Sequence, residues 1–490
     1  MRLWARTILL GSCLLAAALP TAARGSAAGN QAATADYYQR LLAGPQPQLA
    51  ELSLLMTLMP KGGDLHHHYV GAVYAETYLD WAEQQGYCLY RTELTIETKP
   101  AQTAAGKECL PIAAVRMDSN LYRQVLMRWS TQDYDKPGHD QPPPDMQFFN
   151  SFEYFGAVGN HYQPGLQQLK ARAKAENLQY IESMLASAPK IDKSYKAAVI
   201  DRLNTLPPAV DDATLQTVLD EYHDYLAHSE AFQKKIDTYL AEQHANVAGI
   251  DDADFTLRLQ SYTNRSNPPA TVFSGLYSAF VSVQRDPLFV GVNLLGPENG
   301  PVAMRDYDLH MRMLRYLKQK YPATPLSLHA GELAMGMVPP EGLRDHIRNA
   351  VAVAGAKRIG HGVDIAHEQA PYAILKQLRE KDIAVEVNLS SNAIILGILG
   401  EAHPVNLYLR QHVPVVIATD DAGVARSSIS NEYLLFASRY KPGYAQLKRV
   451  VYDSIRLSFL SPADKAAQRK ALDARFAAFE ATVAGIAKNK

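Results

Sequence analysis

The chain has 490 residues, of which 47% are hydrophobic and 20% are charged, the usage of an ordinary globular protein. Its 49 basic and 50 acidic side chains give a formal net charge of −1. Nucleic acid and anionic membrane surfaces are therefore not expected as the main partner, because both favour basic proteins. Three cysteines are too few for a disulfide-dense scaffold. A large enzyme or a binding protein remains.

The N-terminus has the layout of a secretory signal peptide over residues 1–23. Arg2 and Arg6 precede an apolar run, and small residues follow it as a cleavage site. The alternatives are a buried N-terminal helix and lipoprotein processing at Cys13, which lies in a lipobox-like stretch. No later segment offers the ~18 consecutive apolar residues that a spanning helix needs. We therefore predict a secreted or periplasmic protein without a membrane span.

The next segments differ in character. Residues 24–58 are expected to form a helical extension, because apolar residues recur at helical spacing over 35–58. Strand-like and loop-like stretches fill 86–145, which we interpret as an excursion inserted into the main domain, residues 59–490. The excursion carries Cys88 and Cys109. An even pair in an oxidising compartment predicts a disulfide, with two unrelated thiols as the alternative.

Short apolar segments then alternate with helical stretches along the rest of the chain. Such alternation produces parallel sheets, and eight units predict an α/β fold of the (β/α)8 TIM-type barrel class. A doubly wound open sheet is the rival fold, but the glycine-rich phosphate turn that usually marks it is absent. The expected strands are 62–68, 178–185, 255–262, 288–296, 325–331, 357–362, 383–391 and 414–421.

Histidines and acids recur where these strands end, at the face where barrel enzymes build their sites. His66 and His68 share one side of the first strand, whereas His67 points away. This pair could chelate a divalent cation, although surface histidine clusters are common. His329 and Asp420 end later strands, and three histidines with one carboxylate suit zinc with room for a water molecule.

Three further residues could work beside such an ion. Glu332 follows His329 by three residues, which places a carboxyl group near the metal as a proton shuttle requires. His361 lies between two glycines and could orient or deprotonate the water, with a capping or core histidine as the alternative. Asp421 follows Asp420 at the end of an apolar run, where a solvated turn is the less favoured reading.

These stretches together resemble the adenosine/AMP deaminase family of metal-dependent hydrolases. The matching segments are MPKGGDLHHHYVG, LHAGE, RIGHG, VNLSSN and ATDDAGV, in the family's order. The segments GVNLLGPE, SNEY and SIRLSFL are similar to further family signatures, and the resemblance covers about residues 59–460. The signal peptide and the cysteine-bearing excursion look most like the secreted, growth-factor-type branch that includes adenosine deaminase 2.

The resemblance implies a mechanism and a ligand set. One Zn²⁺ per chain would be held by His66, His68, His329 and Asp420. Glu332 would protonate purine N1, and His361 with Asp420 would orient the water that attacks C6. Asp421 would hydrogen-bond N7, the backbone N–H of Gly296 would meet N3, and His68 would border the substrate. These residues would convert adenosine or 2′-deoxyadenosine to inosine and ammonia.

Departures from the family pattern affect substrate choice more than chemistry. Ala422, Asn293 and Leu389 stand where the family usually has proline, an acid and proline. The fourth strand has no lysine that could bridge two metals, so we expect a mononuclear site. The loops after the last two strands offer Arg426 as their one arginine, which favours a nucleoside over AMP. Arg265 is expected to brace the barrel or to contact substrate.

Other functions stay open at this point. Adenine, AMP or a modified adenosine could be the substrate, another aminated ring could replace the purine, or a deaminase-like barrel could bind and signal without turnover. The complete ligand set and Glu332 argue against the last alternative. A homodimer is compatible with the sequence, which gives no firm oligomeric state.

Overall fold

The computed structural model describes residues 26–103, 105–136 and 141–488. The expected signal peptide and Cys13 lie outside these residues. Within them, no helix is both long and apolar enough to cross a membrane.

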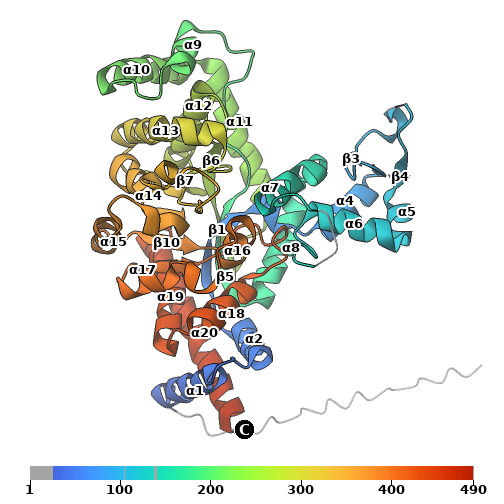
Figure 1. The fold of residues 1–490 in the computed structure, drawn as a ribbon, viewed down its shortest axis with the longest axis vertical. Helices are drawn as coiled ribbons and strands as arrows, with labels where there is room; N and C mark the ends of the chain where they lie inside the picture. Colours follow the sequence, from blue (N-terminus) through green and yellow to red (C-terminus); the bar gives the residue numbers. More distant parts are fainter. Residues whose placement is uncertain (1–25, 104, 137–140, 489–490) are drawn as a thin grey trace, which may run out of the picture.

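Eight parallel strands form a closed barrel, which confirms the predicted fold class (Figure 1). They pair as two four-stranded sheets in the orders β1-β5-β6-β7 and β11-β10-β9-β8. Parallel bridges between Val292 and Leu326 and between His67 and Asp420 join the two sheets. The strands are β1 (Gly62–His68), β5 (Leu178–Met184), β6 (Thr256–Asn264), β7 (Phe289–Leu295), β8 (Ser327–Ala330), β9 (Arg358–His361), β10 (Ala384–Val387) and β11 (Val415–Ile417).

Helices cover the outside of the barrel. They are α8 (Tyr162–Ala175), α9 (Ala198–Thr205), α10 (Asp212–His228), α11 (Glu230–Val247), α12 (Pro269–Arg285), α13 (Pro301–Lys320), α14 (His346–Asn349), α15 (Pro371–Glu380), α16 (Leu389–Leu396), α17 (Val405–Arg410), α18 (Ile429–Tyr440) and α19 (Tyr444–Arg456). Short 3₁₀ or π turns occupy Pro100–Gln102, Gly156–Val158, Pro340–Leu343, Ala350–Ala354, Val363–His367 and Gly400–Ala402.

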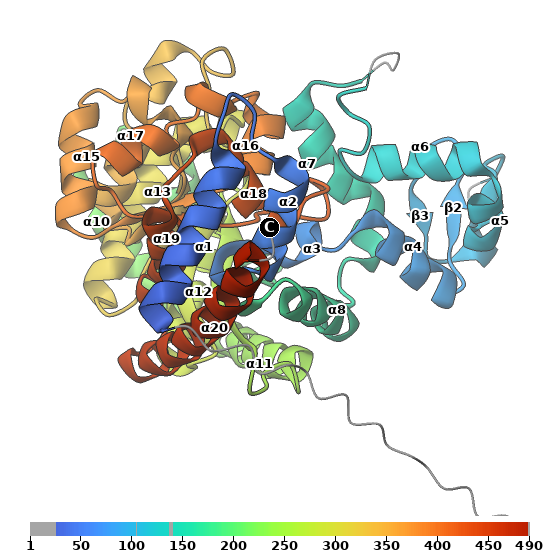
Figure 2. The same ribbon diagram turned by 90° about the horizontal axis from the view of Figure 1, so that it is seen from below.

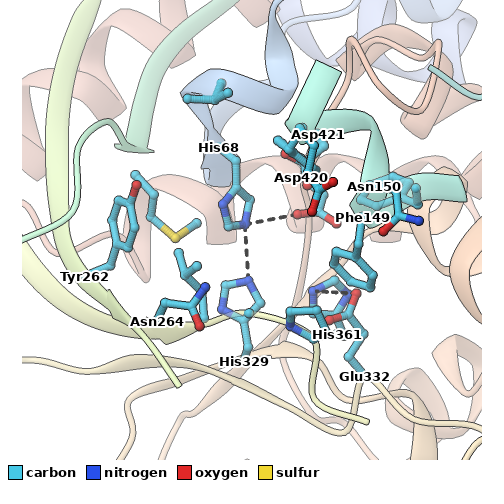
Figure 3. Close-up of a pocket in the computed structure, with 18 residues that line it drawn as sticks. His68, Phe149, Asn150, Tyr262, Asn264, His329, Glu332, His361, Asp420 and Asp421 are labelled. Carbon is cyan, nitrogen blue, oxygen red and sulfur yellow. Dashed lines mark hydrogen bonds and ion pairs between the residues drawn. The ribbon is translucent and has the colours of Figure 1, made fainter. Parts of the chain in front are cut away.

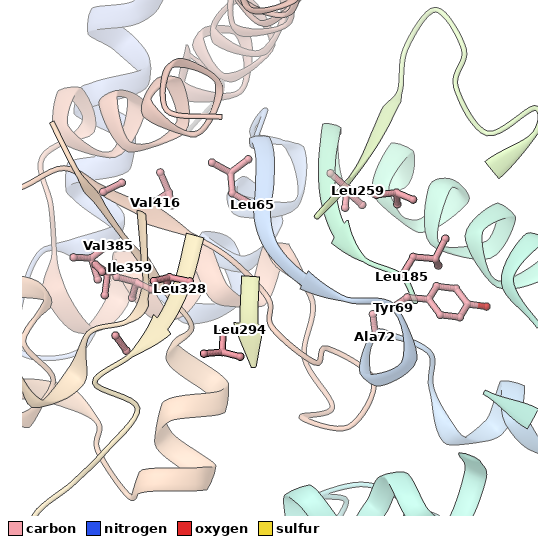
Figure 4. Packing of buried hydrophobic residues seen from close by; sticks show 14 of the residues in the cluster. Leu65, Tyr69, Ala72, Leu185, Leu259, Leu294, Leu328, Ile359, Val385 and Val416 are labelled. Carbon is pink, nitrogen blue, oxygen red and sulfur yellow. The ribbon is translucent and has the colours of Figure 1, made fainter. Parts of the chain in front are cut away.

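The pleat of each strand separates apolar from polar residues. Leu65, Leu328, Ile359 and Val385 are at most 1% exposed and belong to the main hydrophobic core (Figure 4). Their neighbours in sequence point to the opposite face, because side chains alternate along a strand. That face carries His66 and His329 of the predicted site.

The N-terminal extension consists of two helices rather than one continuous periodic run. The helix α1 (Ala27–Leu42) is separated from α2 (Leu49–Leu58) by a stretch in which Gly44 has φ +86°. This left-handed conformation favours glycine and ends helical geometry. Figure 2 shows α1 beside the C-terminal helix α20 (Pro462–Lys488), and Thr34 donates a hydrogen bond to the carbonyl of Glu480 at 3.3 Å.

The excursion projects from the side of the barrel (Figure 1). Its strands β2 (Cys88–Tyr90), β3 (Ile96–Glu97) and β4 (Cys109–Pro111) form a small antiparallel sheet. The predicted disulfide between Cys88 and Cys109 is confirmed. The surrounding helices are α3 (Tyr69–Ala72), α4 (Ala75–Gln84), α5 (Ile112–Met117), α6 (Ser119–Trp129) and α7 (Pro144–Phe155). The last of these continues beyond the expected end of the excursion at residue 145 and returns toward the barrel.

Candidate active site

The four predicted metal ligands converge at the carboxyl ends of the strands. Ligand atoms of His66, His68, His329 and Asp420 all lie within 4.8 Å of one another. His68 Nε2 is 3.1 Å from His329 Nε2 and 3.1 Å from Asp420 Oδ1 (Figure 3). His66 Nε2 lies 3.4 Å from the same oxygen. The spacing of residues 66 and 68 on one strand therefore aims both imidazoles at one point.

Hydrogen bonds behind two of these histidines fix which ring nitrogen faces the centre. His66 Nδ1 lies 2.7 Å from the carboxylate of Glu386, and His329 Nδ1 lies 2.9 Å from Asn293 Oδ1. The Asn293 oxygen is identified because it also accepts the backbone N–H of Leu294. Both Nδ1 atoms donate, so the neutral imidazoles that a metal requires present the lone pairs of both Nε2 atoms to the centre.

A cation fits this donor set. Two bare imidazole nitrogens and a carboxylate oxygen cannot satisfy one another, and His66 Nε2 is buried without a hydrogen bond. Ser391 donates to Asp420 Oδ2 at 2.6 Å, which leaves Oδ1 for the centre. Three nitrogens and one carboxylate oxygen are ligands that Zn²⁺ accepts with a position left open.

Glu332 and His361 lie on one side of this cluster. Their side chains approach to 3.6 Å between Glu332 Oε1 and His361 Nε2. Asn392 Nδ2, whose amide orientation is set by His403, lies 2.9 Å from His361 Nδ1. His361 Nδ1 therefore accepts, and the proton is on Nε2, which is buried without a hydrogen bond.

The backbone is strained at two of these residues. His361 has φ +69° and Asp420 has φ +59°, a left-handed region that residues other than glycine rarely occupy. Such conformations persist where surrounding contacts impose them, and they concentrate at functional sites. Their side chains turn into the cavity at the points where β9 and β11 end.

Burial sets the charge state of the acids. Burial, followed by the negative charges of Asp420 and Glu298, raises the pKa of Glu332 well above its usual range. Burial and the neighbouring Asp420 likewise raise the pKa of Asp421, whose Oδ1 has no hydrogen-bond partner. Gly71 is required opposite Asp421, because a Cβ at position 71 would overlap its carboxylate. Both shifts favour the protonated form of the carboxyl group, which can donate a hydrogen bond.

A cavity of about 500 Å³ opens onto the cluster. It is lined by Glu332, His361, Asp420, Asp421 and Gly296, and by His68 and His329. The rest of the lining was not predicted from the sequence; it includes Phe148, Phe149, Asn150, Phe152 and Glu153 on α7 and Met184, Tyr262 and Asn264 at strand ends. The aromatic spacing within 148–155 is helical and could have revealed the α7 face.

Arg265 was expected either to brace the barrel or to contact substrate, and its contacts in the structure brace the barrel. It is 1% exposed and donates to the carbonyl oxygens of Leu294 and His329, both at 2.8 Å. Its guanidinium thus ties the ends of β7 and β8 together behind the cavity. Arg265 is absent from the residues that line the cavity.

Comparison with known proteins identifies similar sequences and folds. The family model described as adenosine deaminase matches residues 232–475, about half of the chain. An adenosine deaminase of Escherichia coli (strain SMS-3-5) is 32% identical over 152 residues, 31% of this chain and 42% of the relative. One from Clostridium perfringens (strain ATCC 13124) is 27% identical over 137 residues, 28% of this chain and 38% of the relative.

Over residues 232–475 the chain is similar to the adenosine deaminase family. The matches span about two fifths of the length of these curated relatives. The fold agrees with solved structures over a longer range. A crystal structure of an Arabidopsis N6-methyl-AMP deaminase has a TM-score of 0.56 at 17% identity and covers 86% of this chain and 99% of its own. An amidohydrolase from Burkholderia ambifaria, solved with bound Zn, has a TM-score of 0.52 at 19% identity, covering 88% and 94%.

Proposed function

We propose that this protein belongs to the adenosine deaminase family and is a zinc-dependent adenosine deaminase that hydrolyses adenosine and 2′-deoxyadenosine to inosine and ammonia. The observation that carries the proposal is the convergence of three histidine nitrogens with Asp420 in one cavity that Glu332 also lines. Deamination of an aminopurine is the activity that the family supports, and adenosine is the finer choice.

The metal is proposed as one Zn²⁺ per chain on His66, His68, His329 and Asp420. When bound, zinc lowers the pKa of a water molecule toward about 7 and so supplies a nucleophile at neutral pH. One ion is proposed because β7 contains no lysine that could bridge two metals.

The side chains around the cavity supply the remaining chemistry. Water adds to C6 while the Glu332 carboxyl transfers its proton to N1. The Nε2–H of His361 and the carboxylate of Asp420 orient that water. The exocyclic amine takes up one proton of that water, the C6–N bond breaks and ammonia leaves. The remaining hydroxyl proton passes to the Glu332 carboxylate as C6 becomes a carbonyl. A protonated Asp421 donates to N7, and the Gly296 N–H donates to N3.

The cavity lining favours a nucleoside over a nucleotide. No lysine or arginine is among the described residues that line it, whereas Glu153 is. Arg426, the arginine available from the last loops, is bound to the Glu76 carboxylate at 2.7 and 2.9 Å. A 5′-phosphate would therefore find a carboxylate and no counter-ion, which is unfavourable when the phosphate is desolvated.

The location is proposed to be secreted or periplasmic, in the growth-factor-type branch of the family. The Cys88–Cys109 disulfide supports it, because such bridges persist in oxidising compartments.

The test compares adenosine, 2′-deoxyadenosine, AMP and adenine with purified protein, by ammonia release and product chromatography. We expect the two nucleosides to be turned over with kcat/KM at least about a hundredfold above that of AMP. Faster turnover of AMP or adenine would assign a different aminopurine. Absence of turnover with all four would reject the deaminase proposal in favour of a binding protein.

A further inference from the structure

Glu298 is a buried acid in the loop after β7, two residues beyond Gly296 and 1% exposed. Its two carboxylate oxygens accept hydrogen bonds from two consecutive backbone N–H groups. Gly331 donates to Oε1 at 3.1 Å, and Glu332 donates to Oε2 at 2.8 Å. The carboxylate therefore grips the main chain of the residue proposed as the proton donor.

Other side chains hold Glu298 itself in place. His346 Nδ1 lies 2.5 Å from Oε1, and Arg265 Nη1 lies 3.9 Å from Oε2. The His346 ring stacks on Tyr307 with centroids 3.6 Å apart and an interplanar angle of 1°. Burial opposes the charge of Glu298, but His346 and Arg265 outweigh it and lower its pKa to about 2. Glu298 is thus a charged and rigid acceptor.

The segment bound by Glu298, residues 331–332, needs support from outside the segment. β8 ends at Ala330, and Gly331 has φ +75°. A Cβ at position 331 would approach Asp364 to 2.5 Å and Ile347 to 2.8 Å, so this position has no side chain of its own to anchor it. Glycine also has the greatest backbone freedom. The orientation of Glu332 therefore depends on the bonds that its backbone makes.

We propose that Glu298 is a positioning residue that fixes the Glu332 carboxyl against the substrate ring. Glu298 follows Gly296 in the same loop, so one segment sets both the proton donor and the wall that meets the ring. Glu298 touches neither the cavity nor the predicted metal ligands' side chains and acts through the backbone of Glu332. The inference rests on the proposed deaminase activity.

The test is a double-mutant cycle on zinc-loaded full-length enzyme. Glu298→Gln keeps the size of the side chain but sets an amide NH₂ against one of the two N–H donors. We expect kcat for adenosine to fall roughly 10- to 100-fold with KM and zinc content changed less than about threefold, because a small misplacement of a reacting group costs this much. In a Glu332→Ala background, the same substitution should change the residual rate by less than about threefold.

A matched control separates positioning from general destabilisation. Glu368 is also buried, and its Oε1 accepts two consecutive backbone N–H groups, from Ile347 at 2.6 Å and Arg348 at 3.2 Å. Glu368→Gln should lower the melting temperature about as much as Glu298→Gln does and leave kcat within about threefold of the wild-type value. Glu298→Asp is one methylene too short to keep both hydrogen bonds and should lower kcat at least about fivefold. This variant tests the same role if Glu298→Gln does not fold.

Three results would overturn the proposal: wild-type kcat in Glu298→Asp or Glu298→Gln, an undiminished effect of Glu298→Gln without Glu332, or an equal kcat loss in Glu368→Gln. An inactive wild-type enzyme would instead reject the proposed function itself, so the two failures are distinguishable.

Discussion

Two polar clusters lie inside the same barrel and differ in how well they are satisfied. In the inner network, Arg358 bridges Glu182 and Glu386, each at 2.5 Å, and Tyr180, Gln260 and Ser327 complete the bonding. In the mouth cluster, His66 Nε2, His361 Nε2 and Asp421 Oδ1 are buried without hydrogen bonds.

The difference teaches how a structural network can be distinguished from a ligand site. Buried polar groups in stable cores are paired, so unpaired ones require another explanation. The inner network needs no ligand to be complete, whereas the mouth cluster does. Glu386 connects the two, because its Oε1 accepts from Arg358 and its Oε2 orients His66. The inner network thus stabilises the barrel and aims one predicted metal ligand.

Removal of the metal is expected to have the largest effect on the mouth cluster. We expect chelator-treated protein to lose at least about a thousandfold in kcat, because the ion supplies several kcal/mol of transition-state stabilisation and each 1.36 kcal/mol is tenfold. Zinc added back should restore activity at one equivalent per chain, measured by elemental analysis. Full activity in metal-free protein, or a stoichiometry of two, would contradict the proposed centre.

Glu332→Gln tests the mouth cluster without removing its ligands. Loss of the proton donor should lower kcat roughly 10²- to 10⁴-fold, the usual share of general acid catalysis. Zinc content and melting temperature should stay near wild type, because the backbone bonds to Glu298 are unchanged. Glu380→Gln on the exposed face of α15 is the control. A variant with wild-type kcat would show that Glu332 is not the acid.

Arg358→Met tests the inner network. It would leave the Glu182 and Glu386 carboxylates buried without their cation, and breaking such a pair costs about 3–5 kcal/mol. We expect a corresponding loss in the free energy of unfolding, measured with denaturant, with a milder effect on the kcat of the folded fraction. An unchanged free energy of unfolding would contradict the stabilising role of the inner network.

The Cys88–Cys109 bridge should matter least to catalysis. The two cysteines are 21 residues apart in sequence, and closing a loop of this length stabilises a fold by about 3 kcal/mol. The double serine variant should lose local protection from hydrogen exchange over residues 88–111 with kcat changed less than about twofold. A large fall in kcat would show that the excursion takes part in the reaction.

The sequence predicts the barrel and the convergence of the proposed metal ligands well, because both follow from local pattern. Apolar strands alternate with helices, and His66 and His68 share a face by strand geometry alone. His329, His361 and Asp420 were found because they end strands. In each case the signal lies within a few residues of the chain.

The features of the site that the sequence does not predict depend on contacts between distant segments. Glu386, Asn293 and Ser391 set the geometry of the ligands, yet 320 residues separate Glu386 from His66. The α7 wall was missed because the segment begins with prolines that indicate a loop, although Pro144 stands in the first turn of a helix. Its place over the cavity follows from the path of the excursion, which no local pattern specifies.

The most direct test of the central claim is a single turnover of adenosine by the one-zinc protein in ¹⁸O-labelled water, followed by mass spectrometry. The account predicts inosine with one heavy oxygen at C6 and one equivalent of ammonia. Adenosine recovered unchanged, or inosine without the label, would contradict it.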